Sequence, residues 1–318
     1  MVVRFLWAEP IYGYPKGLIV PDQTKVHVYK ANFTGFFPGL LYNKIPIIIN
    51  SKGLRDVEHN YSNPQNAFRI LGLGDSLTLG SGIALEDTYL FNLEKNLQKK
   101  RFNVEIIKAG INSYDLDQEY AFYREEGYAY NPNLIIIGIT LNDIVPVDVQ
   151  KRMKASFGKK DSIASIKKFI QDNCKLCSFI YLSLKPILAW GEKNYNLVYF
   201  ETVYPRWNSS DWSHFSATIL ELNKHLESRD QKLFLLYFPY TFQFNHSIAY
   251  GNLPQEKLFK LSTEKNITFI DMTSRLDTED FKKYYLTGDE VHLNPEGNRV
   301  ASDVILEEML NNNFFDTT

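Results

Sequence analysis

A serine follows an apolar run near residue 70, in the segment Ile70-Leu71-Gly72-Leu73-Gly74-Asp75-Ser76. The run predicts a buried strand, and Gly74 permits a sharp turn where that strand ends. A polar side chain just past a strand of an open α/β sheet lies at the edge where such folds bind ligands. Ser76 is therefore a candidate nucleophile. A serine hydroxyl reacts poorly alone, so the hypothesis requires a base and oxyanion donors elsewhere in the chain.

Asp289 and His292 are the candidate partners of this serine. Their spacing allows one loop to hold both, so that the carboxylate fixes the imidazole tautomer while the other ring nitrogen faces the serine. Asn294 can cap a helix that starts at Pro295, and this helix would anchor the loop. A histidine taken alone is more often a surface or core residue, so the assignment depends on the other motifs.

The residues around Ser76 fit two other well-known motifs poorly. A dinucleotide-binding G-x-G-x-x-G loop would need a third glycine where Leu77 stands. The G-x-S-x-G elbow of α/β-hydrolases would need its second glycine where Thr78 stands. On this stretch alone, a strand-to-helix turn in which Ser76 only caps the helix is equally well supported.

Alternating strands and helices indicate an α/β fold. Apolar runs predict strands near residues 70–73, 104–107, 134–139, 232–239 and 267–270. Leu90, Leu93 and Leu97 share one face of an expected helix, with Asp87 placed to cap it. Such alternation implies a parallel sheet with right-handed crossovers and ligands at the carboxyl ends of its strands.

Two more of these strand ends carry amide groups. Gly110 follows the second strand and can present its backbone N–H, while Asn142 and Asp143 follow the third. An Asn-Asp pair after a strand is usually only a turn. Here the pair shares a sheet edge with Ser76 and Gly110, and that coincidence is the physical evidence for a site.

In order along the chain, these segments resemble four sequence blocks of the SGNH (GDSL) hydrolases. The blocks are Gly-Asp-Ser, Gly110, the Asn142-Asp143 pair and Asp-x-x-His, and they span residues 68 to about 310. Each block alone is a weak indication of the family, but the four blocks in this order are a specific one. The resemblance implies an α/β fold of flavodoxin-like type, a three-layer α/β/α sandwich with a parallel five-stranded sheet.

The resemblance also implies acyl-ester chemistry. Ser76 would attack an ester carbonyl to form an acyl-enzyme, His292 would accept and return the proton, and Asp289 would orient the imidazole. The implied oxyanion donors are the backbone N–H groups of Ser76 and Gly110 and the side-chain amide of Asn142. Asp75 and Asp143 are the implied supporting residues. No metal and no organic cofactor is required.

The expected function is a serine hydrolase acting on carboxylic O-acyl esters. Short-chain or carbohydrate esters are favoured because no strongly apolar run suggests a lipid tunnel, although the family also includes lipases and thioesterases. An O-acyltransferase on a glycan would use the same triad. The intact serine and histidine disfavour a non-catalytic glycan-binding relative, and the incomplete glycine pattern disfavours a nucleotide- or flavin-binding protein.

The chain departs from the family pattern close to Gly110. Lys108 stands where many relatives have asparagine, and Ser113 where a further glycine is common. Both changes affect the expected turn but leave the Gly110 donor in place. Upstream, residues 50–55 resemble the N-S-x-G-x-R lead-in of many bacterial members, and a structural ion pair is expected of Arg55 rather than a contact with substrate.

Composition divides the 318 residues into two parts. Residues 1–66, rich in Pro, Gly, Asn and aromatic residues, predict an irregular N-terminal arm packed on a main domain of residues 67–318. Within that domain, residues 144–230 are too long for a simple connection and predict a helical insertion between the third and fourth strands. Its aromatic residues are expected to pack against the domain, with Trp207 and Trp212 as candidates to line an acyl or sugar pocket.

The charge and the cysteine content limit which partners and metal sites are expected. With 35 basic and 37 acidic residues the formal net charge is -2, which argues against nucleic acid as a partner. The Cys174-x-x-Cys177 pair lacks the second pair of ligands that a structural zinc site needs, so two small apolar residues are expected there.

The sequence leaves the compartment open. No apolar run reaches the roughly 18 residues of a membrane span, and the apolar stretch at the start is too short for a signal peptide. Relatives with a similar front half often carry an N-terminal anchor or signal. An extracytoplasmic location, if such a segment was removed, and a cytoplasmic one both fit.

Overall fold

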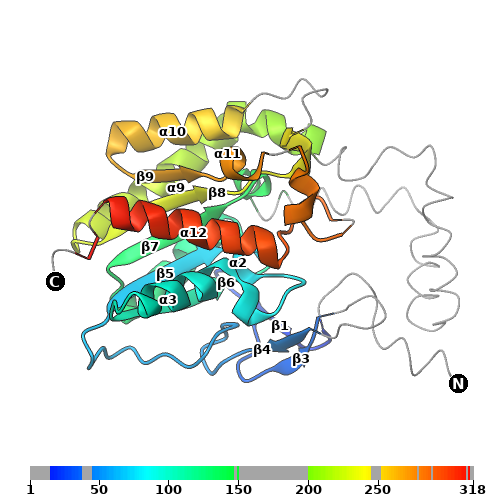
Figure 1. Ribbon diagram of the computed structural model, residues 1–318. Helices are drawn as coiled ribbons and strands as arrows, with labels where there is room; N and C mark the ends of the chain where they lie inside the picture. The colour runs from blue at the N-terminus through cyan, green and yellow to red at the C-terminus, as the bar shows by residue number, and fades with distance from the viewer. Residues whose placement is uncertain are drawn as a thin grey trace, which may run out of the picture.

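A five-stranded parallel sheet forms the centre of the computed structural model of the chain (Figure 1). The structure describes residues 15–37, 45–146, 149, 200–244, 252–277, 279–287, 289–312 and 314–315. The strands are β5 (Phe68–Gly74), β6 (Val104–Gly110), β7 (Leu134–Ile139), β8 (Lys232–Tyr237) and β9 (Thr268–Asp271). Their spatial order is β6-β5-β7-β8-β9, which confirms the predicted flavodoxin-like sheet.

The register of the sheet brings three strand ends together. Gly74 at the end of β5 pairs with Gly110 of β6 on one side and with Gly138 of β7 on the other. Every residue of β7 is buried, as its unbroken apolar sequence predicts for a central strand. The segments that follow β5, β6 and β7 therefore leave the sheet at one edge.

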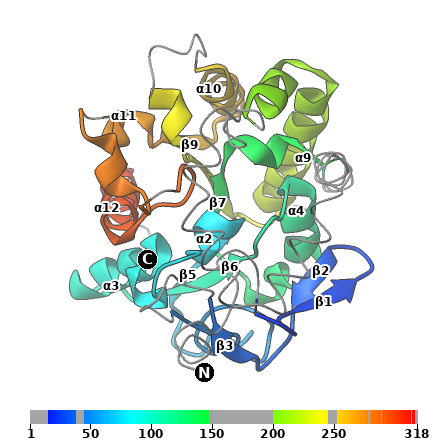
Figure 2. The ribbon, with the colours of Figure 1, turned by 90° about the vertical axis from the view of Figure 1, so that its right-hand side faces the viewer.

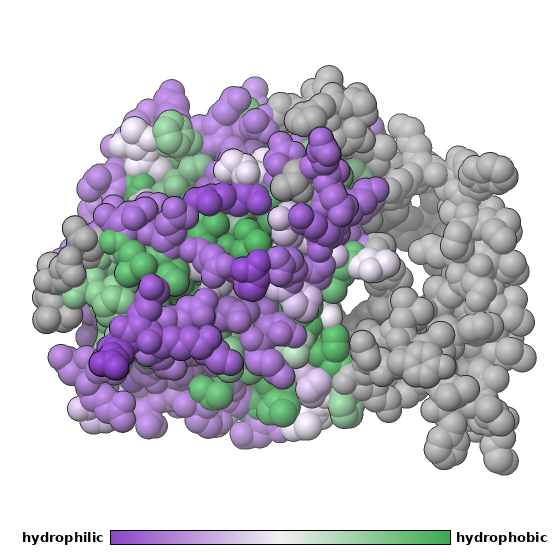
Figure 3. Space-filling model, in the orientation of Figure 1, coloured by the Kyte–Doolittle hydropathy of each residue, from purple (hydrophilic) through white to green (hydrophobic). Residues whose placement is uncertain are grey.

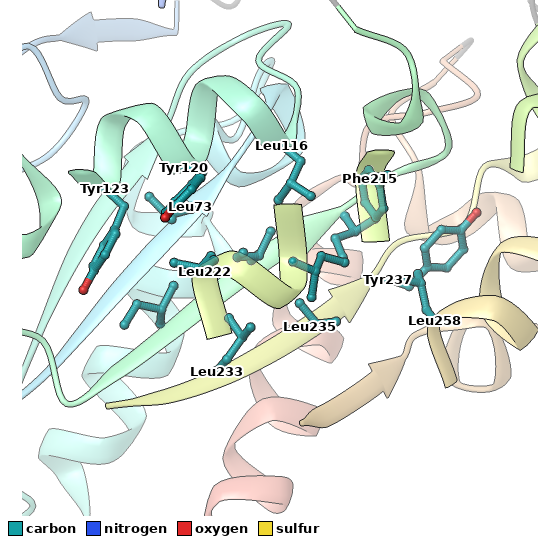
Figure 4. Packing of buried hydrophobic residues seen from close by; sticks show 14 of the residues in the cluster. Leu73, Leu116, Tyr120, Tyr123, Phe215, Leu222, Leu233, Leu235, Tyr237 and Leu258 are labelled. Carbon is teal, nitrogen blue, oxygen red and sulfur yellow. The ribbon is translucent and has the colours of Figure 1, made fainter. Parts of the chain in front are cut away.

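Helices cover both faces of the sheet, and Figure 2 shows the three layers. One face packs against α4 (Leu116–Glu125), α9 (Ser210–Glu227) and α10 (Leu253–Lys265), and the other against α3 (Tyr89–Lys99) and α12 (Pro295–Asn311). In Figure 4, Tyr120 and Tyr123 of α4 and Leu222 of α9 lie over Leu73 and Leu233 of the sheet. The predicted α/β/α sandwich is confirmed.

The remaining elements are short. They are the helices α2 (Ser76–Leu79) and α11 (Thr273–Leu276) and the 3-10 turns η1 (Leu85–Asp87), η2 (Gly127–Tyr130), η3 (Leu141–Ile144), η4 (Tyr204–Asn208), η5 (Thr241–Phe244) and η6 (Phe281–Tyr284). Among the described residues, no helix combines the length and the apolar character needed to cross a bilayer.

Two predicted helix caps have different outcomes. Asn294 caps α12, because its Oδ1 accepts the backbone N–H of Gly297 at 3.0 Å. The prediction that Asp87 caps α3 was wrong, because Asp87 belongs to η1 and α3 begins only at Tyr89. The Oδ1 of Asn298 in α12 accepts the N–H of Tyr89 at 3.0 Å instead, which satisfies a free donor and ties α12 to α3.

The N-terminal arm contains two antiparallel strand pairs. They are β1 (Ile19–Asp22) with β2 (Val26–Tyr29), and β3 (Thr34–Phe36) with β4 (Pro46–Ile48). Leu18 and Ile47 of the arm share a small buried cluster with Leu79 of α2 and with Ile111, which follows β6. The arm thus packs beside the sheet edge that carries Ser76, while the domain boundary at residue 66 stays a prediction.

A buried network of charges joins the segment before β5 to the sheet. Lys108, one of the two departures near Gly110 noted in the sequence, donates from Nζ to Asp56 at 3.2 Å and to Glu94 of α3 at 2.7 Å. His59 bridges Asp56 at 2.9 Å and Glu105 of β6 at 2.7 Å. Burial alone would lower the pKa of His59, but its hydrogen bond to Asp56 and the charge of Asp56 raise it. The lysine at 108 is therefore part of an ion-paired anchor.

The outer sides of α3 and α12 face solvent. The face of the molecule in Figure 3, where these two helices lie in front, is mainly hydrophilic. On α12 the exposed Arg299 pairs with Glu296 at 2.6 Å and with Asp303 at 2.8 Å. Exposed pairs of this kind contribute at most about 1 kcal/mol, so the buried apolar layers hold the helices in place.

Candidate active site

Ser76, His292 and Asp289 form one hydrogen-bonded row. The Nε2 of His292 lies 2.8 Å from the Oγ of Ser76, and its Nδ1 lies 2.7 Å from the Oδ2 of Asp289. The Oδ1 of Asp289 accepts the backbone N–H groups of Val291 at 2.8 Å and of His292 at 3.0 Å. Hydroxyl, imidazole and carboxylate stand in the order that general-base activation of a serine needs.

A tight strand-to-helix turn presents Ser76. A Cβ on Gly74 would lie 2.0 Å from the Oγ1 of Thr78, so only glycine fits where β5 ends. Asp75 caps α2, because its Oδ1 accepts the N–H of Leu77 at 2.9 Å. Helix α2 ends at Leu79 and is followed by Gly80, its C-cap, which has a φ of 73°. Ser76 is the first residue of this short helix, at the edge of the sheet.

Backbone hydrogen bonds close the loop that carries Asp289 and His292. The carbonyl of His292 accepts the N–H of Leu286 at 2.9 Å, and the carbonyl of Tyr284 accepts the N–H of Asn294 at 2.9 Å. The Asn294 cap joins this loop directly to α12. The backbone that carries His292 is therefore fixed by the loop on one side and by the start of α12 on the other.

The pKa values of the two titrating partners move apart. Burial alone would lower the pKa of His292, but the hydrogen bond to Asp289 and the charges of Asp289 and Asp75 outweigh it and raise that pKa above 6.5. Burial alone would raise the pKa of Asp289, yet its hydrogen bond to His292, the imidazolium charge and two backbone donors lower it. The pair thus favours an ionised carboxylate beside a basic imidazole.

Gly110 touches the helix that begins with Ser76. A Cβ built on Gly110 would lie 2.2 Å from the backbone nitrogen of Leu79 and 2.6 Å from the carbonyl carbon of Thr78. These are backbone atoms, so they could not move aside without shifting α2. The absence of a side chain at residue 110 therefore allows the end of β6 to lie directly against the serine turn.

Asn142 lies in η3, just past β7. Its Oδ1 accepts the hydroxyl of Thr140 at 2.9 Å and also the hydroxyl of Tyr240, which follows β8. Its Nδ2 donates to the Oδ1 of Asp143 at 3.2 Å. Three side chains hold the amide in one orientation. The sequence did not identify Tyr240 as a residue of the site. Its position just past the fourth strand was the one feature that could have indicated it.

Asp75 and Asp143 meet at Thr140. The Oγ1 of Thr140 lies 3.4 Å from the Oδ2 of Asp75, and the Oδ2 of Asp143 accepts the backbone N–H of Thr140 at 2.7 Å. Burial raises the pKa of both carboxyl groups, and the charge of Asp75 raises that of Asp143 further. The two aspartates connect the ends of β5 and β7 through Thr140, and the supporting role expected of them stays a prediction.

Glu119 of α4 is a buried carboxyl group that the sequence did not single out. It is 1% exposed, and its Oε1 has no hydrogen-bond partner among the described residues. Burial and the charges of Asp143 and Asp75 raise its pKa well above the usual range. A glutamate on an otherwise amphipathic helix gave no sequence signal for this placement.

Arg55 holds the backbone around α2 rather than a charged partner. Its guanidinium donates to the carbonyl oxygens of Leu79 at 2.9 Å, Gly80 at 3.0 Å, Ile83 at 2.8 Å and Pro46 at 3.3 Å. Burial lowers its pKa to about 10, although Tyr29 and Glu86 act in the opposite direction. In the described part of the chain the expected ion pair is replaced by these carbonyl contacts, because the orphan carbonyls at the end of α2 are the nearest acceptors.

Trp207 belongs to the core, so the idea that it lines a pocket was wrong. Its side chain is 0% exposed, and its ring packs against Phe215 and Tyr237. Its Nε1 donates to the carbonyl of Leu141 at 3.0 Å, which fixes the turn that carries Asn142. Trp212 is only partly buried against the same cluster. The insertion residues 150–199, including Cys174 and Cys177, lie outside the described residues.

The described residues offer no metal centre, and a polar cavity lies away from the site. No group of three or more His, Cys, Asp and Glu side chains among them is placed to hold a metal ion. A polar cavity of about 350 Å³ lies at the amino-terminal ends of β5 and β6, lined in part by His59, Arg69 and Glu105. Because Ser76 lies at the opposite, carboxyl ends of the strands, this cavity is separate from the site.

Comparison with known proteins gives matches in structure. No family model and no curated protein matches the chain. A G-D-S-L family protein from Desulfitobacterium hafniense DCB-2 is similar, with a TM-score of 0.46 and 14% identity over 76% of this chain and 98% of that one. The acetyl xylan esterase AlAXEase has a TM-score of 0.47 and 19% identity over 76% and 98% of the two chains.

A third similar structure is the acetylxylan esterase Axe2 from Geobacillus stearothermophilus. Its TM-score is 0.48, with 18% identity over 76% of this chain and 93% of that one. The Desulfitobacterium protein is described as a lipolytic protein of the G-D-S-L family.

Proposed function

We propose that this chain is a serine esterase of the SGNH (GDSL) type that hydrolyses O-acyl esters. The observation that carries the proposal is the row from Ser76 Oγ to His292 Nε2 at 2.8 Å and from His292 Nδ1 to Asp289 Oδ2 at 2.7 Å. The row stands at the carboxyl edge of a parallel sheet, where α/β folds place their sites.

In the first half of the reaction, the Oγ of Ser76 attacks the ester carbonyl carbon and its proton passes to the Nε2 of His292. The tetrahedral intermediate collapses when the bond to the alcohol oxygen breaks, and His292 returns the proton to that oxygen. Asp289 keeps Nδ1 protonated and stabilises the imidazolium, and this same contact raises the pKa of His292.

In the second half, water attacks the acyl group on Ser76. His292 takes the proton of the water, the bond between the acyl carbon and Oγ breaks, and the proton returns to Oγ as the carboxylic acid leaves. We assign the oxyanion to the backbone N–H groups of Ser76 and Gly110 and the side-chain amide of Asn142. Each such donor is worth about two to three decades in turnover.

The proposed substrates are short-chain or carbohydrate O-acyl esters. The proposal depends on the sequence, which has no strongly apolar run that would build a tunnel for a long acyl chain. Incubation with acetylated polysaccharides and a panel of acyl esters, followed by mass spectrometry of the intact protein, would identify the acyl group that Ser76 retains.

The direct test is hydrolysis of p-nitrophenyl acetate by the unmodified chain and by Ser76→Ala. Turnover that Ser76→Ala abolishes supports the esterase. Ser81→Ala is the matched control, because Ser81 is a nearby serine whose hydroxyl donates to the Oδ1 of Asn112 at 2.9 Å and has no proposed catalytic role. No turnover in any of these proteins, together with retention on a glycan array, would favour a glycan-binding protein instead.

A further inference from the structure

We propose that Tyr240 is a positioning residue for Asn142, in a role that rests on the proposed esterase function. The hydroxyl of Tyr240 donates to the Oδ1 of Asn142. This is the side-chain amide that the proposed mechanism assigns to the oxyanion. Tyr240 itself touches no reacting atom in this assignment, so its effect passes through the amide.

The amide of Asn142 is fixed at both of its ends. The hydroxyl groups of Thr140 and Tyr240, which follow two different strands, both donate to Oδ1. The Oδ1 of Asp143 accepts a hydrogen bond from Nδ2 at 3.2 Å. Donors on the oxygen of an amide draw electron density from its nitrogen, which strengthens the N–H groups as donors. Tyr240 therefore both orients and polarises the group that would bind the oxyanion.

A buried shell places the Tyr240 hydroxyl. The residue is 4% exposed, and its backbone N–H donates to the Oε1 of Gln243 at 2.9 Å. The same Oε1 accepts the hydroxyl of Tyr237 at 3.0 Å, and the carbonyl of Pro239 accepts the hydroxyl of Tyr285 at 2.7 Å. These bonds fix the backbone from which the buried Tyr240 side chain extends, and a side chain with a fixed origin can hold another in place, as preorganised donors require.

The same segment also reaches the loop of the triad. The backbone N–H of Thr241 donates to the carbonyl of Glu290 at 3.0 Å, between Asp289 and His292. The residues after β8 therefore touch both the acid–base loop and the turn of Asn142. An experiment on Tyr240 must separate these two connections, and a change confined to the hydroxyl leaves the backbone bond of Thr241 intact.

The test uses Tyr240→Phe, which removes one oxygen and keeps the ring. With p-nitrophenyl acetate we expect kcat to fall about three- to tenfold, the worth of one hydrogen bond, with KM unchanged. The acid limb of the pH profile should not move, because the contact between His292 and Asp289 is untouched. In an Asn142→Ala background, Tyr240→Phe should have no further effect, since the amide it positions is gone.

The matched control is Tyr123→Phe. Tyr123 is also buried, and its hydroxyl donates to a side-chain amide oxygen, the Oε1 of Gln231, at 2.7 Å. Gln231 directly precedes β8, at the opposite end of the strand from Tyr240. The control should lose stability to a similar degree in urea and keep full turnover.

Three results would overturn the role of Tyr240. They are an unchanged kcat in Tyr240→Phe, an equal loss in the Asn142→Ala background, and a displaced acid limb, which would indicate a disturbed triad loop. Absence of Ser76-dependent turnover in the unmodified chain would instead refute the esterase itself, and this role with it. The two failures are therefore distinguishable in one set of measurements.

Discussion

The Oγ of Ser76 and the Nε2 of His292 lie 2.8 Å apart although 216 positions separate the two residues in the chain. The sheet explains the contact. β5 is a central strand that ends at Gly74, and the loop of His292 returns to its carboxyl end before α12 packs on α3. Two segments from opposite parts of the sequence thus complete one hydrogen-bonded row.

Asp289→Asn should lower kcat by about four decades with the fold retained. An asparagine at this position would favour the wrong imidazole tautomer, so the Nε2 of His292 could no longer accept the serine proton. Steady-state kinetics with p-nitrophenyl acetate measure the loss. Asp303→Asn on the exposed side of α12 is the control and should keep full activity. Equal rates in the two variants would contradict the proposed role of Asp289.

Asn142→Ala should cost about two to three decades in kcat, with a smaller change in KM. The amide oxygen and nitrogen are both hydrogen-bonded, so the variant also removes a link between Thr140 and Asp143. Circular dichroism and thermal unfolding would show whether the fold survives. Full esterase activity in a folded Asn142→Ala protein would remove Asn142 from the oxyanion hole.

Activity and the stability contribution of His292 should respond to pH in opposite directions. The base must be neutral, so kcat/KM should rise with pH through the raised pKa of His292, above the ordinary value of 6.5. A folded-state pKa above the unfolded value adds stability that is fully present below the unfolded pKa and is lost as pH rises through the folded one.

A pH–rate profile and urea unfolding between about pH 5 and pH 9 would measure both trends, since the window brackets the histidine pKa. His292→Gln should remove the part of the stability change that His292 contributes, while the part from the raised pKa of His59 remains. An acid limb clearly below 6.5 would contradict the raised pKa of His292.

Gly110→Ala should destabilise the fold by about 1–3 kcal/mol, as overpacking of a close contact does. The new methyl group would press on the backbone of Leu79 and Thr78 and displace α2, so turnover should fall as well. Gly17→Ala is the control, because Gly17 has a φ of +85° but nothing within 4 Å of an added Cβ. It should cost about 1 kcal/mol from backbone strain and leave turnover unchanged. Urea titrations and kcat would distinguish the two.

Arg55→Met should lower the free energy of unfolding by about 2–4 kcal/mol, because it leaves buried carbonyl oxygens without donors. Arg299→Met changes an exposed arginine of α12 and should alter stability by less than about 0.5 kcal/mol. The midpoint of urea unfolding reports both values. A loss no larger in Arg55→Met than in Arg299→Met would show that the carbonyl contacts contribute little.

The sheet was predictable because its strands are long apolar runs. A strand buried on both faces, such as β7, needs an unbroken hydrophobic segment, and the sequence shows one at residues 134–139. Ser76, Gly110 and Asn142 were found because each stands at or just past the end of such a run. Asp289 and His292 were found from their spacing before a capped helix, and the resemblance to a family supplied the order of all five. The structure brings Ser76, Asp289 and His292 into contact, and their catalytic roles stay proposals.

The details that the sequence missed depend on contacts between distant segments. Tyr240 contacts Asn142, which lies 98 positions away in the chain. Asn298 accepts the N–H of Tyr89 at the start of α3, and these two residues lie 209 positions apart. Arg55 has a charge that suggested an ion pair, yet the nearby helix end offered carbonyl oxygens. Local propensity and spacing carry no information about partners that only the folded chain brings near.

The distance in sequence between Ser76 and His292 also governs when the proposed triad can assemble in a growing chain. During translation the strand β5 and Ser76 are synthesised early, and His292 is added 216 positions later. Over those 216 positions the nascent polypeptide therefore carries the hydroxyl of Ser76 without its proposed base, and the hydrogen-bonded row closes only when the loop of His292 and helix α12 have packed on the sheet.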